Sequence, residues 1–270
     1  EQLLFVADVQ HASQTWKKGD VRETVRILAP YAVSRDAPGG IYGPERFAWR
    51  FLWNRATTPF RDLHDSKQSV WWMQPSPDGK QLVVCGSAGQ LQFLAIDRAF
   101  AVDRTLNAGS VEIGCVVFSD DMQLIATASD GGLVRVYDQQ TLELKQTIET
   151  IPGKNVFVVV FLPDSHQFVA CGQSNLLSLC DADTGESLRQ IETPFDGTIE
   201  FMTLSPDRSR LLASGGDGRI VQLNLDDFSV FAQRKVSSRT IPMAKYSADG
   251  RKIACVGMDD TLHILDADTL

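Results

Sequence analysis

The chain has 270 residues, of which 43% are hydrophobic and 22% charged, values typical of a globular protein with a sizeable core. Its net charge of −8 is uneven: residues 1–61 hold nine Lys and Arg against six Asp and Glu, a net of +3, whereas residues 62–270 hold 17 against 28, a net of −11. In the acidic part, Asp and Glu outnumber the Lys and Arg that would neutralise phosphates, which makes it a poor candidate for nonspecific nucleic-acid binding. No apolar run approaches the roughly 20 residues that span a bilayer, so no membrane insertion is expected within the chain.

The first part of the chain has a helical pattern. Apolar side chains recur at helical spacing through residues 3–30, which predicts a pair of helices. Lys18-Gly19-Asp20 interrupts them, because Gly favours a helix end and Asp a helix start. Glu45–Arg55 then predicts a third helix, rich in aromatic side chains. We therefore expect a helical lead-in at residues 1–58, followed by a β-domain at residues 59–270.

An internal repeat of about 43 residues organises the second part of the chain. An acidic column recurs at steps of 43, 43, 43 and 42 residues, and a second column keeps the same steps. The first column is Asp78, Asp121, Asp164, Asp207 and Asp249, and the second is Gly89, Gly132, Asn175, Gly218 and Asp260. Apolar runs separated by turn residues predict four short antiparallel strands in each unit. A unit of this size has the dimensions of one β-propeller blade.

The units occupy residues ~69–109, ~110–153, ~154–196, ~197–238 and ~239–270, and predict an all-β propeller with five visible four-stranded blades. They resemble the WD-repeat family. The dipeptide that names this family ends the third strand, where the chain has Tyr137-Asp138, Cys180-Asp181 and Leu265-Asp266. The family's Trp and its Gly-His pair are absent from every repeat, so its histidine-centred hydrogen-bond network is incomplete. The resemblance implies a noncatalytic platform that binds protein partners or senses them.

The lead-in carries a second resemblance. The stretch Glu45-Arg46-Phe47-Ala48-Trp49-Arg50-Phe51-Leu52-Trp53 is similar to the segment that joins a membrane-tethered serine/threonine kinase to its C-terminal WD repeats in planctomycete-type bacterial proteins. This resemblance implies a larger signalling protein, with a kinase domain and a membrane tether before Glu1. The first residue is Glu and not an initiator Met, which agrees with this expectation. The protein's partners and its localisation stay open at this point.

The sequence presents no catalytic, cofactor-binding or metal-binding residues. No kinase, P-loop or H-E-x-x-H motif occurs, so we expect neither enzyme activity nor a cofactor. Asp181–Glu186 has a superficial likeness to a calcium loop, but it lacks the remaining ligands and is interpreted as a hairpin turn. The five cysteines form no CxxC pair and fall in apolar strands, which predicts free, buried thiols.

Two alternatives to a binding platform remain open. The first is an enzymatic propeller with a metal in its central channel, as in lactonases, near Glu112 and Glu200. The second is a purely structural spacer.

Partners are expected to contact the loops at one end of the blades, because rigid scaffolds carry function on loops. These are the second-to-third-strand turns, residues 86–90, 129–132, 172–175, 215–218 and 257–260, and the links between repeats, residues 106–111, 149–155, 192–198 and 234–240. The link residues expected to be exposed are Glu149, Pro152, Lys154, Pro194, Phe195, Arg234, Lys235 and Arg239. The glycines at positions 132 and 218 are expected in tight turns with positive φ.

Closure of the propeller has two possible outcomes. The fifth repeat ends at Leu270 without a fourth strand of its own. Either Pro59–His64 pairs with Leu262–Leu265 and closes a five-blade ring, or the protein has more repeats and these five form an open arc. We favour the open arc.

Overall fold

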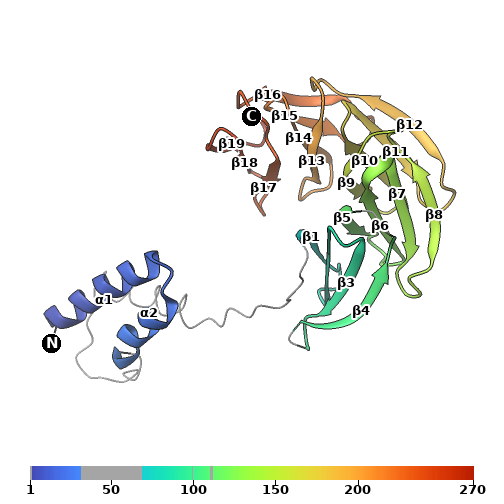
Figure 1. Cartoon of the computed structure of the whole chain (residues 1–270). Coiled ribbons are helices and arrows are strands. Elements are labelled where there is room, and N and C mark those ends of the chain that lie inside the picture. Colours follow the sequence, from blue (N-terminus) through green and yellow to red (C-terminus); the bar gives the residue numbers. More distant parts are fainter. Residues whose placement is uncertain (1, 32–68, 99, 110–111) are drawn as a thin grey trace. The chain divides into compact units, whose positions relative to one another are not determined.

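The computed structural model describes residues 2–31, 69–98, 100–109 and 112–270 (Figure 1). The chain divides into two compact units, Glu1–His64 and Asp65–Leu270. The expected third helix, Glu45–Arg55, and the segment Pro59–His64 both lie outside the described residues. The predictions made for them, including ring closure through Pro59–His64, therefore stay predictions.

The first unit contains the predicted helical hairpin. Its elements are α1 (Gln2–Lys17), α2 (Val21–Leu28) and a short 3-10 turn (Ala29–Tyr31). Gly19 ends α1 with φ +79°, and the Asp20 carboxylate accepts a hydrogen bond of 3.0 Å from the backbone N–H of Glu23. These are the roles that the sequence assigned to Gly and Asp at a helix boundary. Neither of these two described helices has the length and apolar character needed to cross a membrane.

The second unit consists of five antiparallel sheets, each with its strands in chain order. Blade 1 contains β1 (Val70–Pro75), β2 (Gln81–Gly86), β3 (Gln90–Ala95) and β4 (Ala101–Asn107). Blade 2 contains β5 (Ile113–Phe118), β6 (Leu124–Ser129), β7 (Leu133–Asp138) and β8 (Leu144–Glu149). Blade 3 contains β9 (Val156–Phe161), β10 (Gln167–Gly172), β11 (Leu176–Asp181) and β12 (Ser187–Glu192). Blade 4 contains β13 (Ile199–Leu204), β14 (Arg210–Gly215), β15 (Arg219–Asn224) and β16 (Val230–Lys235), and blade 5 contains β17 (Met243–Tyr246), β18 (Lys252–Val256) and β19 (Leu262–Asp266).

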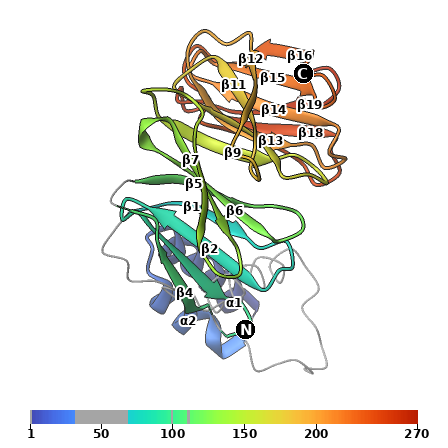
Figure 2. The same cartoon turned by 90° about the vertical axis from the view of Figure 1, so that its right-hand side faces the viewer.

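The blades follow one another in an arc with each first strand innermost and each fourth strand outermost (Figure 1). The turned view shows the same sheets stacked face against face (Figure 2). The first strands of blades 1 to 4 begin at residues 70, 113, 156 and 199, which confirms the 43-residue period and the propeller. Within the described residues blade 5 has three strands, in agreement with a repeat that ends before a fourth strand of its own.

The acidic column closes the turn between the first and second strands. In four repeats a serine hydroxyl donates to the aspartate Oδ1 over 2.5–2.7 Å, in the pairs Ser76–Asp78, Ser119–Asp121, Ser205–Asp207 and Ser247–Asp249. The same Oδ1 accepts the backbone N–H two residues further on, as in an Asx turn. The serine hydrogen bonds are the main reason that the pKa values of three of these carboxyls, Asp78, Asp207 and Asp249, lie below their usual range. The column that reveals the repeat is thus a turn-forming device.

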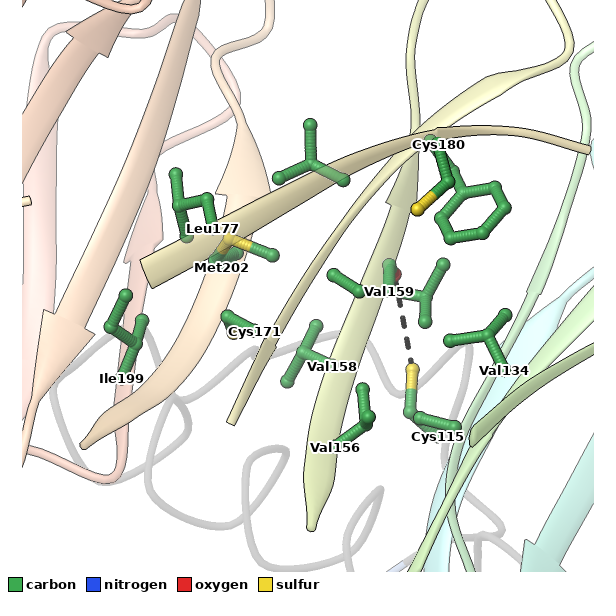
Figure 3. Packing of buried hydrophobic residues seen from close by; sticks show 14 of the residues in the cluster. Cys115, Val134, Val156, Val158, Val159, Cys171, Leu177, Cys180, Ile199 and Met202 are labelled. Atoms are coloured by element: carbon green, nitrogen blue, oxygen red, sulfur yellow. Dashed lines mark hydrogen bonds between the residues drawn. The ribbon is translucent and has the colours of Figure 1, made fainter. Parts of the chain in front are cut away.

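Adjacent blades are held together by apolar side chains between their faces. Figure 3 shows this packing where blades 2, 3 and 4 meet, with Cys115 and Val134 on blade 2, Val158 and Val159 on blade 3, and Met202 on blade 4. All six residues of β6 are buried, which explains why the inner strands read as near-continuous apolar runs.

The fourth strands add polar contacts between neighbouring blades. Each of three fourth strands donates a side-chain hydrogen bond to a carbonyl in the third-to-fourth-strand turn of the next blade. The bonds are Arg104 Nη1 to Gln139 O at 2.9 Å, Gln146 Nε2 to Asp183 O at 2.8 Å, and Arg189 Nη1 to Asp227 O at 3.4 Å. These bonds fix the position of each blade relative to the next.

The five cysteines are free and buried, as predicted. Burial raises the pKa of Cys115 to about 12 and that of Cys180 to about 11, and it also raises the pKa values of Cys85, Cys171 and Cys255. A thiol reacts through its thiolate, so both burial and the raised pKa oppose reaction.

We therefore expect a bulky maleimide to label none of the five cysteines at pH 7 in the folded protein and all five after denaturation. A Thr184→Cys variant, with its added thiol in an exposed turn, should take up one label before denaturation. Mass spectrometry counts the labels. Rapid native labelling, or an intact disulfide, would show that the strands carrying these residues are misplaced.

A histidine between two carboxylates joins blades 2 and 3. His166, in the turn between β9 and β10, places Nδ1 2.8 Å from Asp183 Oδ2 and Nε2 3.0 Å from Asp121 Oδ2. A neutral imidazole has only one N–H, so both contacts are hydrogen bonds only when the ring is protonated. Desolvation by burial lowers the pKa of His166, but the hydrogen bonds to Asp183 and Asp121 outweigh it and raise the pKa above its usual value.

A raised native pKa means that the folded protein binds this proton more tightly than the unfolded chain does. The stabilisation from His166 is therefore fully present below the unfolded pKa of about 6.5 and is lost as the pH rises through the native pKa. We expect the Tm difference between the unmodified chain and His166→Gln to be largest near pH 5.5 and to shrink by pH 9. His263→Gln is the control, since His263 contacts the Thr261 hydroxyl and, among the described residues, forms no ion pair with a carboxylate. An equal Tm difference at both pH values would refute the double hydrogen bond.

Candidate interaction surface

The turns and links that the sequence grouped together lie at one end of the blades. Backbone hydrogen bonds join them: the N–H of Thr150 donates to Gly132 O at 2.8 Å, that of Thr193 to Asn175 O at 3.1 Å, and that of Val236 to Gly218 O at 3.0 Å. We call this end of the propeller the loop face, formed by residues 86–90, 129–132, 172–175, 215–218 and 257–260 with the described links 106–109, 149–155, 192–198 and 234–240. Its backbone is fixed by these bonds before any partner arrives.

Two glycines make this close approach of turn and link possible. Gly132 and Gly218 have φ values of +84° and +83°, as predicted. A Cβ on Gly132 would stand 2.2 Å from Ile151 O, and one on Gly218 would stand 2.1 Å from Ser237 O. Glycine is required here for two reasons, the left-handed backbone and the carbonyl of the link directly beside it.

Most of the link residues expected to be exposed are exposed. They are Glu149, Pro152, Lys154, Lys235 and Arg239. Arg234 is also exposed as a residue, but its guanidinium donates to the carbonyl of Leu270, so it belongs to the contact between blades 4 and 5. These side chains supply both signs of charge to the loop face.

The expectation for Phe195 was wrong. This side chain is buried, with its ring in the space that a side chain at Gly215 would fill, and the neighbouring Pro194 is half-buried. Arg219, which is not among the link residues expected to be exposed, lies beside them, with its guanidinium 3.4 Å from Asp196 and 3.5 Å from Asp217. The sequence feature that could have identified Arg219 is its position directly after Gly218, a member of the second column of the repeat.

The residues considered for metal binding do not converge. Glu112 is exposed, and Glu200 accepts a hydrogen bond of 2.5 Å from the Thr198 hydroxyl. Among the residues that the structure describes, no three His, Cys, Asp or Glu side chains gather in a way that would hold a metal ion. Asp181 Oδ1 accepts the backbone N–H groups of Asp183 and Thr184 at 3.0 and 2.9 Å, so the calcium-like stretch is the predicted hairpin turn.

Comparison with known proteins assigns the repeat. Residues 102–138 match the family model described as WD domain, G-beta repeat. The β-sheet unit is a WD-repeat propeller. The matched residues run from β4 of blade 1 through β7 of blade 2, so the WD repeat and the blade are offset by one strand.

Three relatives illustrate the similarity. The chain is 29% identical over 122 residues to WD repeat-containing protein SL1-17 of Schistosoma mansoni, an alignment that covers 44% of this chain and 38% of the relative. It is 28% identical over 164 residues to WD repeat-containing protein WDS homolog of Arabidopsis thaliana, covering 58% and 31%. It is 23% identical over 146 residues to serine-threonine kinase receptor-associated protein of Gallus gallus, covering 54% and 40%. The chain thus spans less than half the length of each of these relatives.

The close approach of turn and link predicts a large cost for a methyl group at Gly218. Gly131 is the matched control, because its φ is +78° but its Cβ would meet nothing within 4 Å. We expect Gly131→Ala to lower the free energy of unfolding by about 1 kcal/mol through the left-handed backbone. Gly218→Ala should cost a further 1–3 kcal/mol, roughly, because the link must move away. Urea unfolding of both variants measures the difference, and equal losses would mean that the link does not touch this turn.

Proposed function

We propose that this propeller is a noncatalytic platform that binds a protein partner through its loop face. The observation that carries the proposal is the combination of a fixed backbone with exposed side chains at one end of the blades. The turns and links are joined by backbone hydrogen bonds, while Glu149, Pro152, Lys154 and Arg239 are exposed. A surface that is already ordered loses little conformational entropy on binding, which favours affinity.

The chemistry of the chain supports a protein partner over a nucleic acid. Residues 62–270 carry 17 Lys and Arg against 28 Asp and Glu, a net of −11, which repels a phosphate backbone. The relatives share WD repeats with this chain, and two of the three are named for these repeats. The loop face carries exposed side chains of both charges, so it can form specific contacts with charged groups of either sign on a partner.

We further propose that the chain is the C-terminal part of a larger bacterial signalling protein, such as a serine/threonine kinase tethered to a membrane. The likeness of Glu45–Trp53 to the segment between kinase and WD repeats supports this context. The three relatives come from animals and a plant, so they bear on the repeat and not on the context. The coding sequence upstream of Glu1 tests the proposal: a kinase domain and a membrane span there would support it, and a different domain would refute it.

A site-specific photo-crosslinking experiment tests the platform. A benzophenone amino acid is placed on the loop face at Pro152 or Arg239, and on the opposite end of the blades at Gln140 or Asp226, all of which are exposed. In the cells of origin we expect one protein band to be crosslinked from positions 152 and 239 and not from positions 140 and 226. Equal crosslinking from both ends, or from the opposite end alone, would place the partner elsewhere.

A further inference from the structure

One link of the loop face differs in charge from the others. Residues 234–240, which join blades 4 and 5, contain Arg234, Lys235 and Arg239 and no Asp or Glu, a net of +3. The links 149–155 and 192–198 have net charges of 0 and −2, and residues 62–270 together have a net of −11. We call residues 234–240 the basic link. It is a local concentration of positive charge on a strongly acidic domain.

Two cations of the basic link are exposed and have no anionic partner. Lys235 and Arg239 are both exposed, and neither forms an ion pair among the described residues. The guanidinium of Arg239 donates to the carbonyl of Met258 at 3.4 Å, and that of Arg234 is occupied by the carbonyl of Leu270. Several other cations of the propeller are neutralised in ion pairs: Arg98–Asp103, Arg208–Asp120, Arg210–Asp268 and Lys252–Asp266.

The carboxylates of the two adjoining turns, residues 215–218 and 257–260, hold the fold together. Asp259 accepts a hydrogen bond of 2.6 Å from the Ser237 hydroxyl. Asp217 is held by Arg219, whose backbone N–H donates to it at 3.0 Å and whose guanidinium lies 3.5 Å away. Asp260 is exposed. Among the described residues of these turns, the basic link therefore faces at most one free carboxylate.

The fold also brings the exposed cations close to a third one. Lys235 lies directly opposite Arg219 in the pair of strands β15 and β16, where like charges repel. Arg239 lies beside the same turn, since its carbonyl would be 2.8 Å from a Cβ on Gly218. Blade 4 packs between blades 3 and 5, so these side chains are exposed with both neighbouring blades in place. The gathering of cations costs stability, and an anionic partner would relieve that cost.

We propose that the basic link binds an acidic segment of the protein partner, with Lys235 and Arg239 donating to its Asp and Glu carboxylates. The inference rests on the proposed function, because it names the chemistry of the partner that the loop face binds. The two cations are four residues apart in the chain, so an extended segment of about five residues reaches both. Charge complementarity selects a partner and its orientation, and the acidic remainder of the domain repels such a segment from other positions.

A labelled peptide tests the chemistry directly on the whole chain. The probe is fluorescein-Gly-Glu-Asp-Glu-Gly-Glu-Asp-Glu-Gly, and its counterpart carries Gln and Asn in place of Glu and Asp. Fluorescence anisotropy at low salt should show that the acidic peptide binds more tightly than the neutral one. Equal binding of the two peptides, or no binding of either, would overturn the proposal.

A double charge reversal assigns the binding to the basic link. Lys235→Glu combined with Arg239→Glu should weaken binding of the acidic peptide by about tenfold, because two attractive contacts become repulsive. Lys145→Glu combined with Arg251→Glu is the matched control, since it reverses one exposed Lys and one exposed Arg at the opposite end of the blades. The control makes the same change in net charge and should leave binding within about twofold. Equal weakening by both variants would assign the effect to net charge and refute the site. Thermal melts verify that both variants fold.

The band crosslinked from position 152 separates this inference from the proposed function. We expect that band to be lost in the variant with Lys235→Glu and Arg239→Glu and to be retained in the control variant. A band that persists in the first variant would leave the platform in place and overturn the acidic segment. If positions 152 and 239 of the unmodified chain give no band, the platform itself is refuted, and the peptide titration still decides whether the basic link binds carboxylates.

Discussion

No blade of this propeller buries its own apolar surface. An inner sheet is apolar on both faces, so it becomes stable only between two neighbours, and the hydrophobic effect acts between sheets more than within them. The backbone groups, by contrast, are satisfied inside each sheet, by antiparallel pairs such as Ala126↔Val136 in blade 2. Apolar packing between sheets and backbone pairing within each sheet together determine the rest of the structure. They explain the apolar inner strands, the buried thiols and the polar fourth strands.

What the sequence predicted were the contacts that recur in every blade. The 43-residue period, the strand positions and the turn roles of Asp121 and Gly132 all follow from chemistry repeated at fixed spacing. The helical hairpin followed from local signals at Gly19 and Asp20. Such features need only the alternation of apolar and turn residues.

What the sequence did not predict were contacts made once. His166 meets Asp121 from the preceding blade and Asp183 from its own, and no column of the repeat links those three positions. Phe195 was assigned to the surface because it stands in a link, yet the missing side chain of Gly215 leaves space for its ring. Repeated patterns report the average blade, whereas these contacts depend on one pair of neighbours. The repeat tolerates such departures: Leu162 replaces the turn serine in the third repeat, and there the Asp164 N–H donates to Asp120 instead.

The offset between repeat and blade has a consequence for a severed chain. A cut within a link would separate whole blades and leave two apolar faces without a covalent connection. A cut in the turn between β7 and β8, at residues 139–142, would instead leave blade 2 with three strands on one fragment and place β8 at the new end of the other. In the intact chain Leu133 pairs with Glu149 and Val134 pairs with Ile148. After the cut these pairs would have to form between the two fragments, so that β8 of one fragment completes the sheet of the other. The third-to-fourth-strand turns are therefore the natural places to divide this protein into two complementing pieces.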